Sequence, residues 1–157
     1  MVALKIIETK PFMAHLLKGS LFDTWEGRQM EIRTYTKFSI DCKVNKDFYT
    51  QEEFELLHHT SYASWSQLKE SVFQIIKGNK TPTEMKIVLA KPITSIEDLD
   101  PNLVDGVFIN IHFENGGVVI TTGTSMKTFT LDKSTDHYWD NCVKDFFQRN
   151  GILFEER

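Results

Sequence analysis

Two apolar runs decide the fold of this chain: Val107-Phe108-Ile109-Asn110-Ile111-His112-Phe113 and Val118-Val119-Ile120-Thr121-Thr122. Between them lies Glu114-Asn115-Gly116-Gly117. Asn-Gly is the strongest short signal for a hairpin, because both central residues of a type I′ turn need a positive φ. A two-residue loop then pairs the residues of one apolar face: Phe113 with Val118, Ile111 with Ile120, and Ile109 with Thr122. The turn and the alternation therefore agree on an antiparallel hairpin.

Length and composition indicate an ordinary globular protein. The 157 residues suit a single α+β domain, 1–157, that can bury a core without disulfides. The net charge of −4 and the absence of a Lys/Arg run argue against a nucleic acid partner.

The cysteines and the lack of long apolar runs indicate the compartment. Cys42 and Cys142 match no metal spacing, and free thiols are typical of a cytoplasmic protein, which we expect this to be. No apolar run suits a signal peptide or a membrane helix, so no membrane partner is expected.

Hydrophobic periodicity predicts further strands and helices. Strands are predicted where apolar residues alternate, namely over 2–7, 30–44, 85–89, 127–131 and 152–154. The run 30–44 is long enough to need a reversal, and a three-residue loop at Asp41-Cys42-Lys43 would preserve its alternation. Helices are predicted over 9–18, 61–77 and 135–149, with Thr9 as the first N-cap. Thr50 and Glu53 form a capping box that opens a short helix through Leu57.

Together these elements predict an α+β fold: a curved antiparallel sheet of about five to seven strands, with helices packed on one face. Four stretches also resemble an uncharacterised bacterial family, a domain of unknown function. They are Ile75-Ile76-Lys77-Gly78-Asn79-Lys80-Thr81-Pro82, Gly106-Val107-Phe108-Ile109-Asn110-Ile111, Thr121-Thr122-Gly123-Thr124-Ser125 and Phe129-Thr130-Leu131-Asp132-Lys133. The resemblance covers nearly the whole chain, and it implies a small cytoplasmic protein without implying an activity or ligand.

The second face of the hairpin carries the first candidate binding residues. His112, Asn110 and Thr121 share it, and Arg33 and Tyr35 are predicted to share the same sheet surface. Aromatic, basic and hydrogen-bonding groups on an open sheet can bind a ligand or a peptide. An ordinary solvated sheet face is the simpler interpretation and is favoured.

The hydroxyl-rich segment 122–125 is a second candidate. Its backbone N–H groups and the hydroxyls of Thr124 and Ser125 could hold a phosphate. A β-turn in which Gly123 supplies a positive φ is favoured instead, because such turns are common.

The histidines do not predict a metal site. His58 and His59 are adjacent, so on a helix their side chains diverge by about 100°, and no Cys/His spacing supports them. On the last predicted helix, Asp136 could orient His137 for acid–base chemistry, although charged residues on a polar helix face are usually only solvated. No catalytic residue, metal or cofactor is predicted.

Three functions stay open. The favoured one is a non-catalytic binding or interaction module that uses the polar sheet face or an edge strand to bind a protein or small molecule. The second is a hydrolase-like enzyme with His112 or His137 as general base, near Ser125 or Asp136. The third is a weak binder of single-stranded nucleic acid through Arg33, Tyr35 and Lys37.

Overall fold

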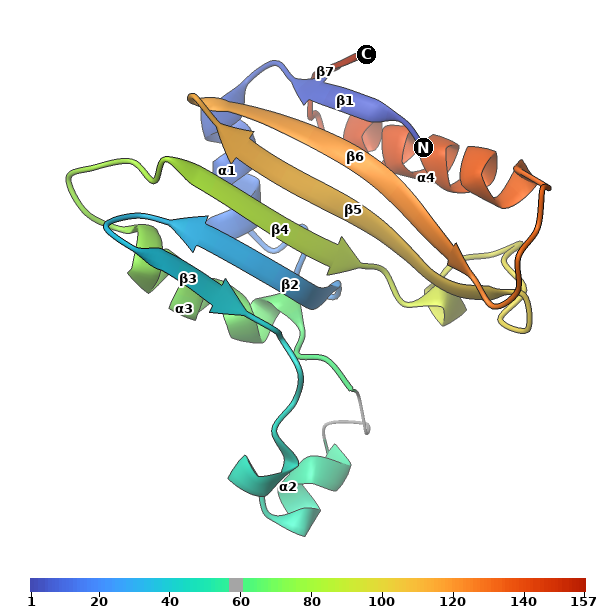
Figure 1. Ribbon diagram of the computed structural model, residues 1–157, viewed down its shortest axis with the longest axis horizontal. Helices are drawn as coiled ribbons and strands as arrows, with labels where there is room; N and C mark the ends of the chain where they lie inside the picture. The colour runs from blue at the N-terminus through green and yellow to red at the C-terminus, as the bar shows by residue number, and fades with distance from the viewer. Residues whose placement is uncertain (57–60) are drawn as a thin grey trace.

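Seven strands form one antiparallel sheet in the computed structural model, which describes residues 1–56 and 61–157 (Figure 1). The order across the sheet is β3-β2-β4-β5-β6-β1-β7. The strands are β1 (Ala3–Ile6), β2 (Glu26–Arg33), β3 (Lys37–Ile40), β4 (Glu84–Ala90), β5 (Val104–Glu114), β6 (Gly117–Met126) and β7 (Phe154–Glu156). The helices are α1 (Thr9–Leu17), α2 (Gln51–Leu56), α3 (Trp65–Ile76) and α4 (Ser134–Arg149), with short 3-10 turns η1 (Lys46–Phe48) and η2 (Ile93–Ser95). The predicted fold class is confirmed.

The β5–β6 hairpin forms at the predicted turn. Asn115 and Gly116 have φ angles of 54° and 75°, the left-handed values that a two-residue hairpin loop requires. The register follows from that loop and pairs Phe113 with Val118, Ile111 with Ile120, and Ile109 with Thr122. All six of these side chains are buried, so this face of the hairpin belongs to the core.

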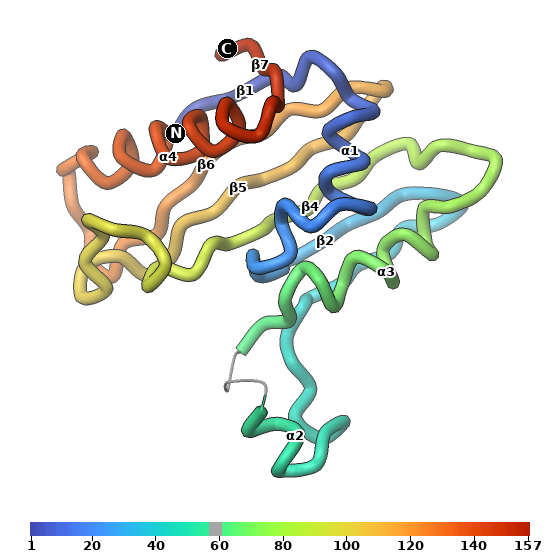
Figure 2. The backbone as a smooth tube through the Cα atoms, turned by 180° about the vertical axis from the view of Figure 1, so that it is seen from behind, coloured from blue at the N-terminus to red at the C-terminus, as the bar shows by residue number. Residues whose placement is uncertain are grey.

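The core lies between the sheet and three helices. Figure 2 shows α1, α3 and α4 in front of the strands, whereas the face of the sheet seen in Figure 1 carries no helix among the described residues. Each of the three tryptophans is at most 2% exposed. Two of them also satisfy a backbone carbonyl, since Trp65 Nε1 donates to Leu16 O at 2.7 Å and Trp139 Nε1 donates to Phe108 O at 2.9 Å.

The reversal within 30–44 occurs earlier than predicted. Strands β2 and β3 are joined by Thr34-Tyr35-Thr36, and Arg33 pairs with Lys37. The predicted loop at Asp41-Cys42-Lys43 was wrong because a three-residue loop preserves the side-chain alternation wherever it falls. Cys42 instead has a φ of 63°, which turns the chain beyond the end of β3.

The segment 122–125 is strand rather than turn. Thr122 to Ser125 continue β6 opposite β5, as far as the pairs Thr124 with Val107 and Ser125 with Gly106. Gly123 does not have a positive φ, so it supplies no turn. The strand predicted over 127–131 does not form, and Phe129 and Leu131 are 90% and 82% exposed.

Two predicted helix starts shift. The N-cap of α1 is Glu8 rather than Thr9. Helix α3 begins at Trp65 rather than near Ser61, because Ser64 and Gln67 form a reciprocal capping box that fixes the first turn. The capping box at the start of α2 is confirmed, with Glu53 N donating to Thr50 Oγ1 at 3.1 Å and Thr50 N donating to Glu53 Oε1 at 2.9 Å. Leu57, His58 and His59 lie outside the described residues.

Candidate functional site

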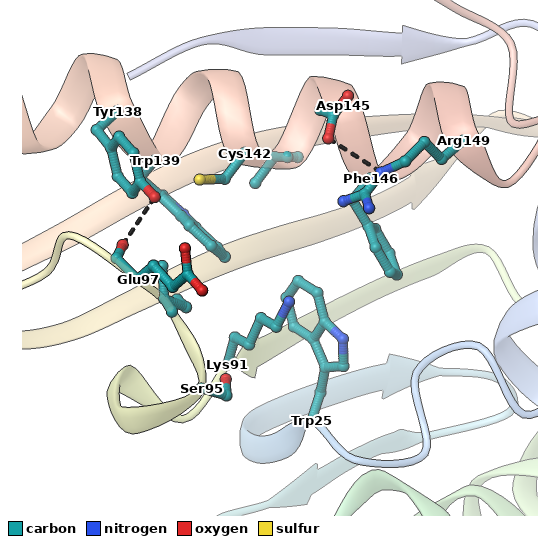
Figure 3. Close-up of a pocket in the computed structure, with 12 residues that line it drawn as sticks. Trp25, Lys91, Ser95, Glu97, Tyr138, Trp139, Cys142, Asp145, Phe146 and Arg149 are labelled. Atoms are coloured by element: carbon teal, nitrogen blue, oxygen red, sulfur yellow. Dashed lines mark hydrogen bonds and ion pairs between the residues drawn. The ribbon is translucent and has the colours of Figure 1, made fainter.

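A pocket of about 240 Å³ lies on the helix-covered side of the sheet, between α4 and the segment that follows β4 (Figure 3). Four aromatic side chains line it together with charged groups and one thiol, and we call it the aromatic pocket. Its lining residues are Trp25, Lys91, Ser95, Ile96, Glu97, Tyr138, Trp139, Cys142, Val143, Asp145, Phe146 and Arg149.

The β2–β4 ladder positions two of these residues. Glu26 pairs with Ala90, so Trp25 and Lys91 stand one residue beyond the last pair of the two antiparallel strands. Because successive side chains of a strand alternate between the two faces, both project toward the helices. A backbone hydrogen bond of 2.7 Å from Trp65 N to Trp25 O fixes this end of the ladder against the start of α3.

Helix α4 supplies the opposite wall. Tyr138, Cys142 and Phe146 recur at a spacing of four, which places them on one stripe of the helix. Trp139 lies beside this stripe and is fixed by its hydrogen bond to the Phe108 carbonyl. The aromatic wall is therefore attached to the sheet through Trp139.

Lys91 brings an ammonium group to these rings. Its Nζ lies 5.9 Å from the ring centre of Trp25 and 5.7 Å from that of Phe146, which is within the range of a cation–π interaction. In the part of the chain that the structure describes, no carboxylate or other acceptor bonds to this ammonium group. The N–H donors of Lys91 are thus available to an anion in the pocket.

The other polar groups of the pocket are mostly engaged. Arg149 Nε contacts Asp145 Oδ2 at 3.0 Å, and the Tyr138 hydroxyl donates to the backbone carbonyl of Glu97 at 2.7 Å. Burial raises the pKa of the Tyr138 phenol above its usual value, and the neighbouring Cys142 raises it further. Tyr138 is therefore a neutral hydrogen-bonding group at physiological pH.

A second cluster lies on the open face of the sheet, around predicted residue His112. Its Nε2 lies 3.3 Å from Glu84 Oε2 and 3.4 Å from Glu114 Oε2. The other oxygen of Glu84 lies 3.6 Å from Arg33 Nε and 3.9 Å from Lys86 Nζ. The hydrogen bond from His112 lowers the pKa of Glu84, and Lys86, the charge of His112 and Arg33 contribute smaller effects.

The structure brings only some of the predicted site residues together. Asn110 and Thr121 are paired across β5 and β6 on the same face as His112, and Ser125 shares that face by alternation. Thr124 lies on the opposite face, where its hydroxyl bonds to Asp136 of α4. Tyr35 is 91% exposed at the β2–β3 loop, with its ring edge-on to Phe38 on the core side of the sheet.

The residues of the aromatic pocket were not predicted as a site. Trp139 and Cys142 fall within the helix predicted over 135–149, and Trp25 lies between two predicted elements. The chain order gives no signal for Lys91, because its neighbours in the pocket come from α4 and from the segment before β2. Only the sheet pairing reveals this set.

The chain is an α+β protein whose antiparallel sheet is covered by helices on one face. The aromatic pocket lies on the covered face, and the cluster around His112 lies on the open face. The chain belongs to a family of unknown function, DUF5721, whose model matches residues 15–155. No curated protein matches the chain, and no solved structure matches it. Among the described residues, no helix has the length and apolar character needed to cross a membrane.

Proposed function

We propose that this protein is a non-catalytic binding module that holds a small planar anion, such as an aromatic carboxylate, in the aromatic pocket. The observation that carries the proposal is the ammonium group of Lys91, which reaches the pocket with rings as its neighbours and without a carboxylate bonded to it. An aromatic carboxylate complements both features, because its ring can pack on the walls while its charge accepts hydrogen bonds from Lys91.

The size and lining of the pocket support a small ligand. Its volume of about 240 Å³ lies just below the range of about 300–1,000 Å³ typical of drug-sized ligands. Trp25 and Trp139 are each 2% exposed, so the walls are fixed before any ligand binds. Such preorganisation favours binding because little side-chain ordering is required.

A binding role is favoured over hydrolysis by the composition of the pocket. Among the described residues its lining includes no histidine, and one of its two carboxylates, that of Asp145, is paired with Arg149. A general base needs a titratable group within hydrogen-bond reach of the reacting proton. His112 does contact two carboxylates, but it lies on the open face of the sheet rather than in this pocket.

Calorimetric titration with benzoate and with benzamide tests the proposal, because the two probes share a ring and differ in charge. Benzoate should bind at least tenfold more tightly, since a hydrogen bond to a charged group contributes about 1.5–3 kcal/mol. Lys91→Met keeps much of the aliphatic stem over the rings and should abolish that preference. The matched control Lys127→Met changes an exposed lysine outside the pocket and should retain it.

Two results would overturn the proposal. One is the absence of benzoate binding at millimolar concentration to a folded wild-type protein. The other is a benzoate preference that survives in Lys91→Met, because the anion would then be recognised elsewhere.

A further inference from the structure

We infer that Glu84, His112 and Glu114 form a binding site for zinc or a similar divalent first-row metal ion on the open face of the sheet. The site is separate from the aromatic pocket, which lies on the other face. It does not rest on the proposed function.

The strand pairing brings the three side chains together. His112 and Glu114 are two residues apart on β5, so their side chains project to the same face. Glu84 of β4 is paired directly with Glu114. Lys86, two residues after Glu84 on the same strand, is paired with His112. The cluster is therefore built on two central strands of the sheet, which hold its backbone positions rigidly.

The distances fit a metal ion. Zinc lies about 2.0–2.2 Å from imidazole nitrogen and carboxylate oxygen, so two ligand atoms of a tetrahedral site are roughly 3.4 Å apart. The distances from His112 Nε2 to the nearest oxygens of Glu84 and Glu114 are 3.3 Å and 3.4 Å. One ligand atom from each of the three residues lies within 4.8 Å of the other two. Small side-chain rotations would bring all three ligand atoms within bonding distance of one ion.

Two basic side chains orient the carboxylate of Glu84. Arg33 and Lys86 both approach Oε1 of Glu84, whereas Oε2 faces His112. Such outer partners fix the direction of a metal-binding carboxylate. The side chains of His112 and Glu114 are 40% and 49% exposed, so an ion can enter from solvent and water can complete its coordination.

The choice of ion follows from the ligand types. One imidazole with two carboxylates suits zinc and its first-row neighbours better than magnesium or calcium, which prefer oxygen ligands alone. The alternative is that the three side chains are held only by the contacts from His112 Nε2 to the two carboxylates. That arrangement would bind no metal, and it is the result that would contradict the inference.

Zinc titration followed by calorimetry provides the test. The adjacent His58 and His59 also carry imidazoles, so the measurement is made in a His58→Ala/His59→Ala double variant. This variant should bind one zinc ion per chain. His112→Ala and, separately, Glu114→Gln in that background should each weaken binding at least tenfold, because even outer-shell changes cost 10- to 100-fold.

Two controls make the result decisive. His137→Ala removes a histidine that lies outside the cluster and should leave zinc affinity unchanged. Glu114 has an exposed side chain, so Glu114→Gln should keep the fold even if His112→Ala does not. Absence of zinc binding, or binding that survives both His112→Ala and Glu114→Gln, would overturn the inference.

Discussion

Nζ of Lys91 lies 5.9 Å from the ring centre of Trp25, and the two residues occupy equivalent positions just beyond the last pair of β2 and β4. The sheet therefore places a cation and an aromatic wall beside each other. Helix α4 completes the enclosure with Trp139 and Phe146. The pocket follows from the strand register, and changes to the register or to α4 should affect it.

The two thiols should differ in reactivity. Burial raises the pKa of Cys42 to about 11, and Asp41 adds to the effect. Because the thiolate is the reactive form, Cys42 should resist iodoacetamide in the native protein at pH 8. Cys142 is half-buried at the aromatic pocket and should react first, which peptide mass spectrometry can measure.

The same experiment gives a control for ligand binding. Benzoate should slow the alkylation of Cys142 and leave that of Cys42 unchanged, and both thiols should react fully in urea. Equal native rates for the two cysteines would contradict the burial of Cys42.

The hairpin turn should carry a conformational cost when its glycine is replaced. Gly116 has a φ of 75°, and a Cβ added there would meet nothing within 4 Å. Gly116→Ala should therefore lower the free energy of unfolding by about 1–2 kcal/mol through backbone strain alone. Urea denaturation measures the change, and Gly117→Ala is the control because its φ is not in the left-handed region. Equal effects of the two substitutions would argue against the turn.

Packing at the start of β2 should be equally sensitive for a different reason. A Cβ on Gly27 would lie 2.3 Å from Leu68 Cδ1 and 3.1 Å from Cys42 Sγ. Gly27→Ala should cost about 1–3 kcal/mol in unfolding free energy, a typical penalty for overpacking. Gly27→Ala/Leu68→Ala should restore part of the loss if the contact with Leu68 is responsible. A single variant as stable as the wild type would show that α3 can move away.

Features of this chain that depend on local interactions were predicted correctly from the sequence, whereas features that depend on long-range pairing were not. Asn115-Gly116 and the Thr50/Glu53 capping box are local, and both were predicted correctly because their own side chains and backbone determine the geometry. The β2–β3 reversal was misplaced because alternation alone does not locate a loop of odd length. Thr122 to Ser125 read as a turn locally, but pairing with the long strand β5 overrides that preference.

The residues of the two candidate sites were harder to predict for the same reason. His112 was selected correctly as a residue of the open face, yet its partner Glu84 comes from another strand and carries no motif spacing. Lys91 and Trp25 are distant in sequence and meet only through the β2–β4 register. Cross-strand sets of this kind depend on tertiary pairing, which local patterns do not encode.

The most direct test of the binding proposal uses the three indole N–H signals in an NMR spectrum, assigned with single Trp→Phe variants. Trp25 and Trp139 line the aromatic pocket, whereas Trp65 lies outside it and donates to the Leu16 carbonyl. Addition of benzoate should shift the signals of Trp25 and Trp139 and leave that of Trp65 unchanged. No shift in either pocket signal, or a shift in Trp65 alone, would contradict the proposed function.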